Sequence, residues 1–191
     1  AVALRWRVRV HGSTECIYFA NEFIGHVVHQ YFGTRHRSAT ANPGIDMLVL
    51  DTWRTGPGIL ESDMLGVFNG FWLIASTPID DGLERIWSGM MVKVNDGAVP
   101  ASEEDVAAAR AFAQNGIHGL GQDVEIWMNK RECINPMALP ADGPYGRLRT
   151  WYRQFYNPRP KAAELQQRSN GRTVTLDRRK EVGLQSETFP A

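Results

Sequence analysis

The sequence has little cysteine, no surplus of charge of either sign and no long apolar run. Its 191 residues contain only Cys16 and Cys133 and no Cys-x-x-Cys, so a disulfide framework, a four-thiolate zinc site and an iron–sulfur cluster cannot be built from these residues. Sparse cysteine favours a reducing, cytoplasmic compartment. Lys plus Arg and Asp plus Glu both number 21, which argues against sequence-independent nucleic-acid binding. No run approaches the ~20 apolar residues of a membrane-spanning helix.

The middle of the chain has the pattern of an antiparallel meander. The segment IDMLVLDTWR alternates in polarity and stops at a Gly-Pro-Gly turn. The segments MLGVF and FWLIAS flank Asn69-Gly70, a dipeptide typical of two-residue hairpins, and ERIWSGMMVKV follows the turn at 78–82. We expect three or four strands here, with one face turned toward a core.

Two other segments show helical spacing. Residues 15–32 place Ile17, Ile24, Val28 and Phe32 roughly on one helical face, which predicts a helix or two helical turns. After Pro100, apolar residues recur every three or four positions, which predicts a long amphipathic helix over about 103–131.

The ends of the long helix are also marked in the sequence. Ser102 and Asp105 have the spacing of an N-terminal cap. Beyond residue 157 the chain becomes polar and rich in Pro, Arg and Gln, so we expect a mobile tail over 158–191.

Asp123 is the carboxylate of most chemical interest. It lies beside the apolar stripe of the predicted long helix, and Gly119 one turn earlier leaves space over that stripe. Burying an unpaired carboxylate costs several kcal/mol, so Asp123 either faces water at the edge of the stripe or is held by a partner, which could be a bound cation. From spacing alone we favour an edge carboxylate paired with Lys or Arg. A non-haem Fe(II) site uses two His and one carboxylate, and His11 and Asp123 could supply two of the three ligands. Spacing alone does not bring them together.

Two other features of the sequence each allow two interpretations. His26 and His29 form an H-x-x-H pair that would share one face of a helix and could bind metal, but H-E-x-x-H is absent and we favour ordinary hydrogen-bonded histidines. A curved sheet with a helix across it could enclose an apolar ligand or simply have a filled core.

The longest specific signature covers residues 121–156. It contains Gln-Asp-Val-Glu-Ile-Trp, then Asp-Gly-Pro, then Arg-x-Trp-Tyr-x-Gln-Phe-Tyr, and a second signature, EFIGHVVHQYFGTRHR, covers 22–37. Both resemble the catalytic domain of Rieske non-haem iron oxygenases of the steroid-hydroxylating type, the 3-ketosteroid 9-alpha-hydroxylases. The resemblance spans roughly residues 11–157, with a looser middle at 40–100.

The resemblance implies an α+β helix-grip (START-like) fold, in which a curved antiparallel sheet wraps around a long C-terminal helix. It implies a mononuclear Fe(II), with Asp123 matching the carboxylate ligand and His11 the second histidine. It also implies hydroxylation of a steroid or similar apolar polycyclic substrate, with O2 and electrons from NADH. The electrons would pass through a ferredoxin-type reductase and a [2Fe-2S] Rieske cluster, in a parent protein that is a homotrimer.

The N-terminal residues depart from that family. The first histidine ligand falls on Trp6, the aspartate that links the two metal centres falls on Ala3, and residues 1–10 lack family character. We therefore expect 1–157 to be an N-terminally incomplete catalytic domain without the Rieske domain, inactive alone, from an incomplete or mis-started reading frame. The alternatives are a metal-free helix-grip module that binds an apolar lipid and, with little support, a His26/His29 metallohydrolase.

Overall fold

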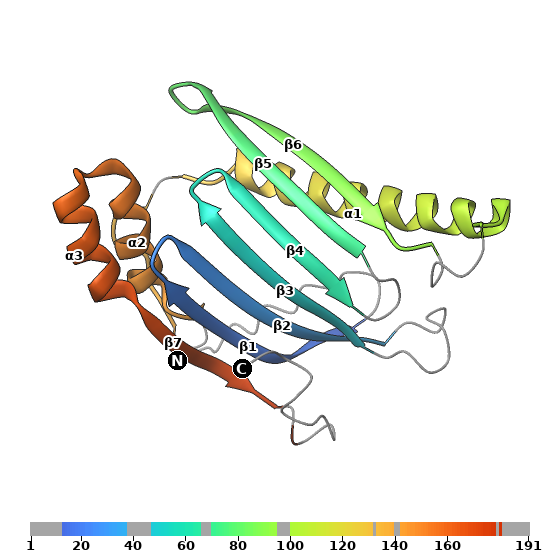
Figure 1. Cartoon of the computed structure of the whole chain (residues 1–191), viewed down its shortest axis with the longest axis horizontal. Coiled ribbons are helices and arrows are strands. Elements are labelled where there is room, and N and C mark those ends of the chain that lie inside the picture. Colours follow the sequence, from blue (N-terminus) through green and yellow to red (C-terminus); the bar gives the residue numbers. More distant parts are fainter. Residues whose placement is uncertain are drawn as a thin grey trace.

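The computed structural model describes residues 13–37, 47–65, 70–94, 100–131, 133–139, 142–178 and 180. Seven strands form one antiparallel sheet in the order β6-β5-β4-β3-β2-β1-β7, accompanied by three helices and a short 3-10 turn (Figure 1). The strands are β1 Ser13–Ile24, β2 Val27–Arg37, β3 Met47–Gly56, β4 Ile59–Leu65, β5 Gly70–Asp80, β6 Leu83–Val92 and β7 Gly171–Asp177. The helices are α1 Glu103–Met128, α2 Tyr145–Arg153 and α3 Arg159–Ser169, with η2 at Gln154–Tyr156. The predicted helix-grip-like α+β fold is confirmed.

The predicted meander is present as β3 to β6, each strand paired with the next along the chain. β4 begins at Ile59, earlier than the predicted segment MLGVF, whose last three residues lie outside the described part of the chain. Glycine is required at the turn between β3 and β4, because a Cβ on Gly58 would lie 2.7 Å from the Ser76 carbonyl oxygen of β5. The Ser76 amide donates to the Gly58 carbonyl at 2.7 Å, so the turn is bonded directly to the neighbouring strand. This close approach lies just beyond the Ile59–Ala75 pair, at the end of the pairing between β4 and β5.

The predicted helix over 15–32 is wrong, because these residues form the β1–β2 hairpin. Gly25 has a positive φ of 60°, which suits the first position of a two-residue turn. Side chains on both faces of β1 are buried, so its sequence lacks the polar–apolar alternation that would have marked a strand. Apolar residues therefore occur on both faces of β1, and some of them fall by coincidence at helical spacing.

The long helix is confirmed as α1, with the predicted cap. The Ser102 hydroxyl accepts from the Asp105 amide at 3.1 Å, and an Asp105 carboxylate oxygen accepts from the Ser102 amide at 3.0 Å. The helix runs behind β5 and β6 in Figure 1 and approaches β6 closely. A Cβ on Gly116 would lie 2.5 Å from the Met90 methyl group. Within the described part of the chain, no helix is both long and apolar enough to cross a bilayer.

Residues 159–177, assigned to the mobile tail from sequence, instead form α3 and β7, so that prediction is wrong for them. β7 pairs with β1 and extends the sheet. Leu165 and Ser169 of α3 are buried, and the Asn170 side-chain oxygen accepts from the Gly25 amide at 2.9 Å. The composition is misleading because β7 is an edge strand and α3 buries few residues. Residues 181–191 lie outside the described part.

The second half of the signature stretch forms α2 and η2, which hold the β1–β2 turn. Trp151 is fully buried against Phe23 and Val28. Its Nε1 and the Gln154 Nε2 both donate to the Gly25 carbonyl, at 3.1 and 3.2 Å. The Trp and Gln of Arg-x-Trp-Tyr-x-Gln-Phe-Tyr therefore have a structural role, which is to join α2 to the sheet.

Candidate functional site

One face of the sheet, which we call the inner face, carries both α1 and α2. Phe112 and Gly116 of α1 approach Gly70 and Met90, and Trp151 of α2 packs in the cluster described above. Side chains alternate along each strand, so between bulges the register of the sheet tells the residues of this inner face from those of the opposite, outer face.

A row of polar side chains crosses the inner face from β1 to β4. Register pairs place Asn21 opposite Gln30, Gln30 opposite Thr52, and Thr52 opposite Ser62. The Gln30 amide nitrogen donates to the Asn21 side-chain oxygen at 3.1 Å. The Thr52 and Ser62 hydroxyls are hydrogen-bonded at 2.7 Å. We call these four residues the polar row.

The polar row has donor capacity to spare. Asn21, Thr52 and Ser62 are 3–5% exposed, and Asn21 Nδ2 has no hydrogen-bond partner among the described residues. The hydroxyl pair of Thr52 and Ser62 holds two hydrogens, of which their mutual bond uses one. A buried donor without an acceptor costs about 1–3 kcal/mol. The row is therefore suited to donate hydrogen bonds to a carbonyl oxygen placed against the inner face.

Asp123, the predicted carboxylate ligand, lies on α1 between buried Leu120 and half-buried Val124, and its own side chain is exposed. A Cβ on Gly119 or Gly121 would meet no atom within 4 Å, so the helix surface around Asp123 is open. A carboxylate is a suitable oxygen donor for Fe(II). Within the described ranges no group of three His, Cys, Asp or Glu side chains could hold a metal ion.

His11 lies outside the described residues, as do Trp6 and Ala3. The structure therefore supplies one of the expected metal ligands, and ligation by His11 and Asp123 stays a prediction.

His26 and His29 do not share a helical face. His26 lies in the β1–β2 turn, while His29 lies on β2 and points from the outer face toward Asp51 of β3. His29 Nδ1 and Asp51 Oδ1 are 3.5 Å apart, and in the described structure neither atom has a hydrogen-bond partner. The ring stacks on Trp53 at a centroid distance of 6.1 Å. These contacts join neighbouring strands and do not assemble a metal site.

The apolar residues considered as cavity walls divide between the faces. Trp72 and Ile74 alternate with the outer-face residues of β5 and lie on the inner face, where Trp72 Nε1 donates to Ser88 at 2.8 Å. Phe71 lies on the outer face, with its ring 6.0 Å from that of Trp53. Phe68 lies outside the described residues. Trp72 and Ile74 therefore remain candidates for lining a ligand site.

Among the described residues of the outer face, Tyr31 is the group with a strongly shifted pKa. Burial, followed by the Asp51 and Glu22 carboxylates, raises the pKa of Tyr31 to about 12, although the Arg172 guanidinium opposes the shift. That guanidinium lies 5.5 Å from the Tyr31 ring centroid. The contact between Arg172 and Tyr31 links β7 to β2 across the intervening strand β1.

We expect this shift to make stability depend on pH in the alkaline range. Between pH 10 and 12 the unfolded chain releases the Tyr31 proton and the native chain keeps it, so the native state loses roughly 2–3 kcal/mol of stability as pH rises. Denaturant unfolding of wild type and Tyr31→Phe at several pH values measures the effect. The variant should lose less stability over this window, and parallel curves would contradict the assignment.

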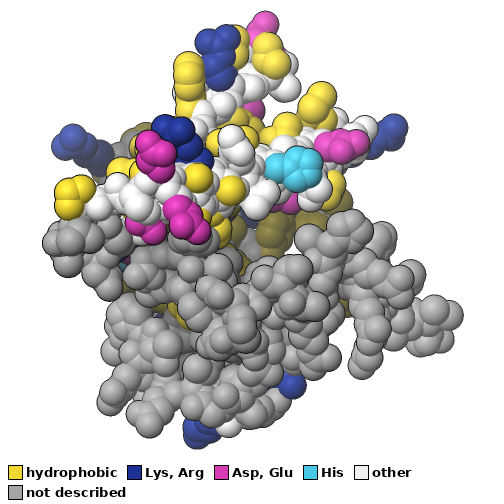
Figure 2. Space-filling view, turned by 90° about the vertical axis from the view of Figure 1, so that its right-hand side faces the viewer, with side chains coloured by type: hydrophobic (Ala, Val, Ile, Leu, Met, Phe, Trp, Pro, Cys, Tyr) yellow, Lys and Arg dark blue, Asp and Glu magenta, His cyan; other side chains and the backbone are white. Residues whose placement is uncertain are grey.

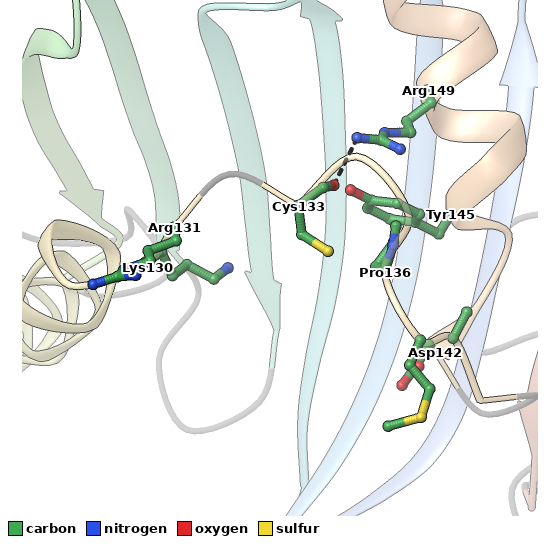
Figure 3. A pocket seen from close by; sticks show the side chains of 9 residues that line it. Lys130, Arg131, Cys133, Pro136, Asp142, Tyr145 and Arg149 are labelled. Atoms are coloured by element: carbon green, nitrogen blue, oxygen red, sulfur yellow. Dashed lines mark hydrogen bonds between the residues drawn. The ribbon is translucent and has the colours of Figure 1, made fainter.

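A pocket of about 700 Å³ lies beyond the end of α1. Figure 3 shows Lys130 and Arg131 on one side and Cys133, Tyr145 and Asp142 on the other. Asp123 and the polar row are not among the lining residues. The pocket therefore lies apart from the inner-face features. Elsewhere, basic, acidic and apolar side chains are intermixed on the described surface seen in Figure 2.

Sequence reasoning missed the polar row. Two of its members, Asn21 and Gln30, fall in the segment that was predicted to be helical, so they were not expected to share one face of a sheet. Thr52 lies in a correctly predicted strand, but Ser62 precedes the predicted segment MLGVF and belongs to a part of β4 that was not predicted. The position of Thr52 opposite Ser62 follows from the register of β3 and β4, which the sequence does not give. Polar residues at inward strand positions are the signal that identifies such a row.

The chain was compared with known proteins. A sequence model described as 3-ketosteroid 9alpha-hydroxylase C-terminal domain matches residues 7–156. Two proteins of Rhodococcus rhodochrous, each named 3-ketosteroid-9-alpha-monooxygenase, oxygenase component, are 30% and 32% identical over 150 and 149 residues. A protein of the same name from Mycobacterium tuberculosis is 26% identical over 148 residues. Each alignment covers 73% of this chain and 38% of the relative, so the chain spans well under half of their length. The chain belongs to the family of 3-ketosteroid 9alpha-hydroxylase C-terminal domains.

Proposed function

We propose that this chain is the substrate-binding and iron-binding part of an oxygenase component that hydroxylates a 3-ketosteroid. The family match and the names of the relatives support the reaction class. The observation that carries the proposal within the structure is the polar row, since it presents buried hydrogen-bond donors on the face of the sheet that α1 crosses. A 3-ketosteroid is an apolar ring system with a ketone acceptor at one end, which suits such a face.

In this proposal Asp123 and His11 are two of the ligands of a mononuclear Fe(II). The family's remaining ligand is a histidine, and the matching position in this sequence is Trp6. Bound there, the iron would supply the chemistry of dioxygen activation and C–H hydroxylation. The family match over residues 7–156, which includes both His11 and Asp123, supports this role. A Rieske cluster, a ferredoxin-type reductase and a homotrimer belong to the proposal for the whole protein.

The residues of this chain would bind and orient the substrate. Thr52 and Ser62 would donate the spare hydroxyl hydrogen to the ketone oxygen, and Asn21 would offer its amide nitrogen nearby. Trp72 and Ile74, on the same face, would contact the apolar rings. A hydrogen bond at one end of a rigid ring system fixes which carbon lies beneath α1, and so contributes to the site of oxidation.

The double variant Thr52→Val with Ser62→Ala tests this role. We expect its affinity for androst-4-ene-3,17-dione to fall about tenfold, because a lost hydrogen bond of this kind is worth about 1 kcal/mol or slightly more. Titration of the intrinsic tryptophan fluorescence measures the affinity. Removing both hydroxyls together leaves no unpaired partner, so stability should change little.

Two controls make the test specific. Thr77→Val, at an exposed position on β5, should bind like wild type. Androstan-17-one, which lacks the oxygen at carbon 3, should bind wild type and the double variant equally well. An equal loss for both steroids, or no loss for either, would contradict hydrogen bonding between the row and the ketone.

The metal-free lipid-binding alternative is not favoured, because the relatives are named as oxygenase components. The iron content of the purified protein distinguishes the oxygenase hypothesis from the lipid-binding hypothesis. Tight steroid binding by a protein that takes up no Fe(II) would favour the lipid-binding module.

A further inference from the structure

The last two turns of α1, which carry Asp123, have few contacts of their own. Residues 121–128 are exposed except for half-buried Val124. The close contacts of α1 with the sheet come from Phe112 and Gly116, further toward its N-terminus. The last buried side chain of α1 is that of Leu120, so residues 121–128 have little packing of their own to fix their position.

The segment after α1 is bonded to α2 through Arg149. Asn129 closes the helix by donating its side-chain amide to the Glu125 carbonyl at 2.8 Å. The chain then reaches Cys133 and Ile134, whose carbonyl oxygens accept from the Arg149 guanidinium at 3.1 and 2.6 Å. Figure 3 shows Arg149 extending from α2 toward Cys133. These bonds have a charged donor and are stronger than neutral ones.

Arg149 also contacts a ring on its own helix. Its guanidinium lies 5.1 Å from the centroid of the Tyr145 ring, one turn earlier on α2. Two residues later, Trp151 is buried and bonded to the β1–β2 turn. A connected path therefore runs from the sheet through Trp151 and Arg149 to the segment that follows α1.

We propose that Arg149 is a positioning residue for Asp123. By holding the Cys133 and Ile134 carbonyls, it sets the axial placement of the last turns of α1, and the helix transmits that placement to the carboxylate. The inference rests on the proposed function in which Asp123 is a metal ligand. Lysine could supply one donor but cannot hold two carbonyls with a planar fork, so Arg149→Lys should restore only part of the effect.

Hydrogen exchange measured by mass spectrometry tests the structural half of the proposal without any metal. In Arg149→Met we expect amides of residues 121–131 to exchange about tenfold faster, and those of 103–112 to be unchanged. Arg149→Lys should be intermediate. Arg153→Met, an exposed arginine on the same helix, is the matched control and should match wild type. Equal acceleration of both segments, or none, would overturn the proposal, because Arg149 would then act on the whole fold or on nothing.

Co(II) titration tests the functional half. We expect Arg149→Met to bind Co(II) about tenfold more weakly than wild type, with partial recovery in Arg149→Lys and none of the loss in Arg153→Met. Faster exchange in 121–131 with unchanged Co(II) affinity would overturn the positioning role. Unchanged Co(II) binding in Asp123→Ala would instead overturn the ligand assignment of the proposed function, while the exchange experiment would still decide whether Arg149 holds the end of α1.

Discussion

Replacing Trp151 by Ala should lower the free energy of unfolding by about 3–5 kcal/mol, the range typical of a fully buried tryptophan. The indole packs against Phe23 and Val28, and its edges meet Tyr152 and Phe155 at centroid distances of 4.9 Å. Its removal leaves a cavity at the junction of α2 and the sheet and also removes one of the two side-chain donors to the Gly25 carbonyl. Urea unfolding followed by far-UV circular dichroism measures the change.

Two further variants separate packing from hydrogen bonding at this junction. Trp151→Phe keeps much of the packing but loses the Nε1 bond, and it should cost less than Trp151→Ala. Tyr156→Ala removes an aromatic ring of the same signature stretch that is 75% exposed, and it should change stability by less than about 0.5 kcal/mol. If Tyr156→Ala were as damaging as Trp151→Ala, the junction would not be organised around the tryptophan.

Replacing Asp123 by Ala should abolish stoichiometric Fe(II) binding. A carboxylate ligand supplies both a coordination bond and a negative charge, and even residues that only support ligands change metal affinity about 10–100-fold. Anaerobic titration with Fe(II), followed by desalting and iron analysis, measures the occupancy. Wild type should retain iron and Asp123→Ala should not.

Glu125→Ala is the matched control for Asp123→Ala. Glu125 is an exposed carboxylate two residues further along the same helix, and only its backbone carbonyl has a described hydrogen bond. Its loss should leave iron binding intact. If both variants retain iron, or both lose it, the general negative charge of α1 or another site would account for binding.

Features with a strong local cause could be predicted from sequence. The Ser102–Asp105 cap and the three- and four-residue spacing behind it identify α1 without reference to the rest of the fold. The turn residues between β3 and β6 likewise predict the meander. Each of these signals depends on neighbours within a few positions along the chain.

Features that depend on partners distant in the sequence could not be predicted. The β1–β2 hairpin is buried on both faces because β7, α2 and the rest of the fold surround it, and none of these is adjacent in sequence. β7 is a polar segment that becomes a strand by pairing with β1. The polar row exists only through a register shared by four strands.

The residues of the candidate site were likewise predictable only in part. The resemblance identified Asp123, and α1 carries it at the predicted place, but its companion His11 lies outside the described residues. Arg149, Trp151 and Gln154 were part of the recognised signature, yet only the structure shows that they connect the sheet to the end of α1. A signature identifies the family, and the contacts then explain which of its residues act on structure.

Crystals of the chain grown with Fe(II) and measured at the iron absorption edge give the most direct test of the proposed metal centre. A single anomalous peak is expected about 2 Å from an Asp123 carboxylate oxygen, the distance at which carboxylates bind divalent first-row metals. A peak beside His29 and Asp51, or no peak in crystals that contain ordered Asp123, would contradict an iron site on α1.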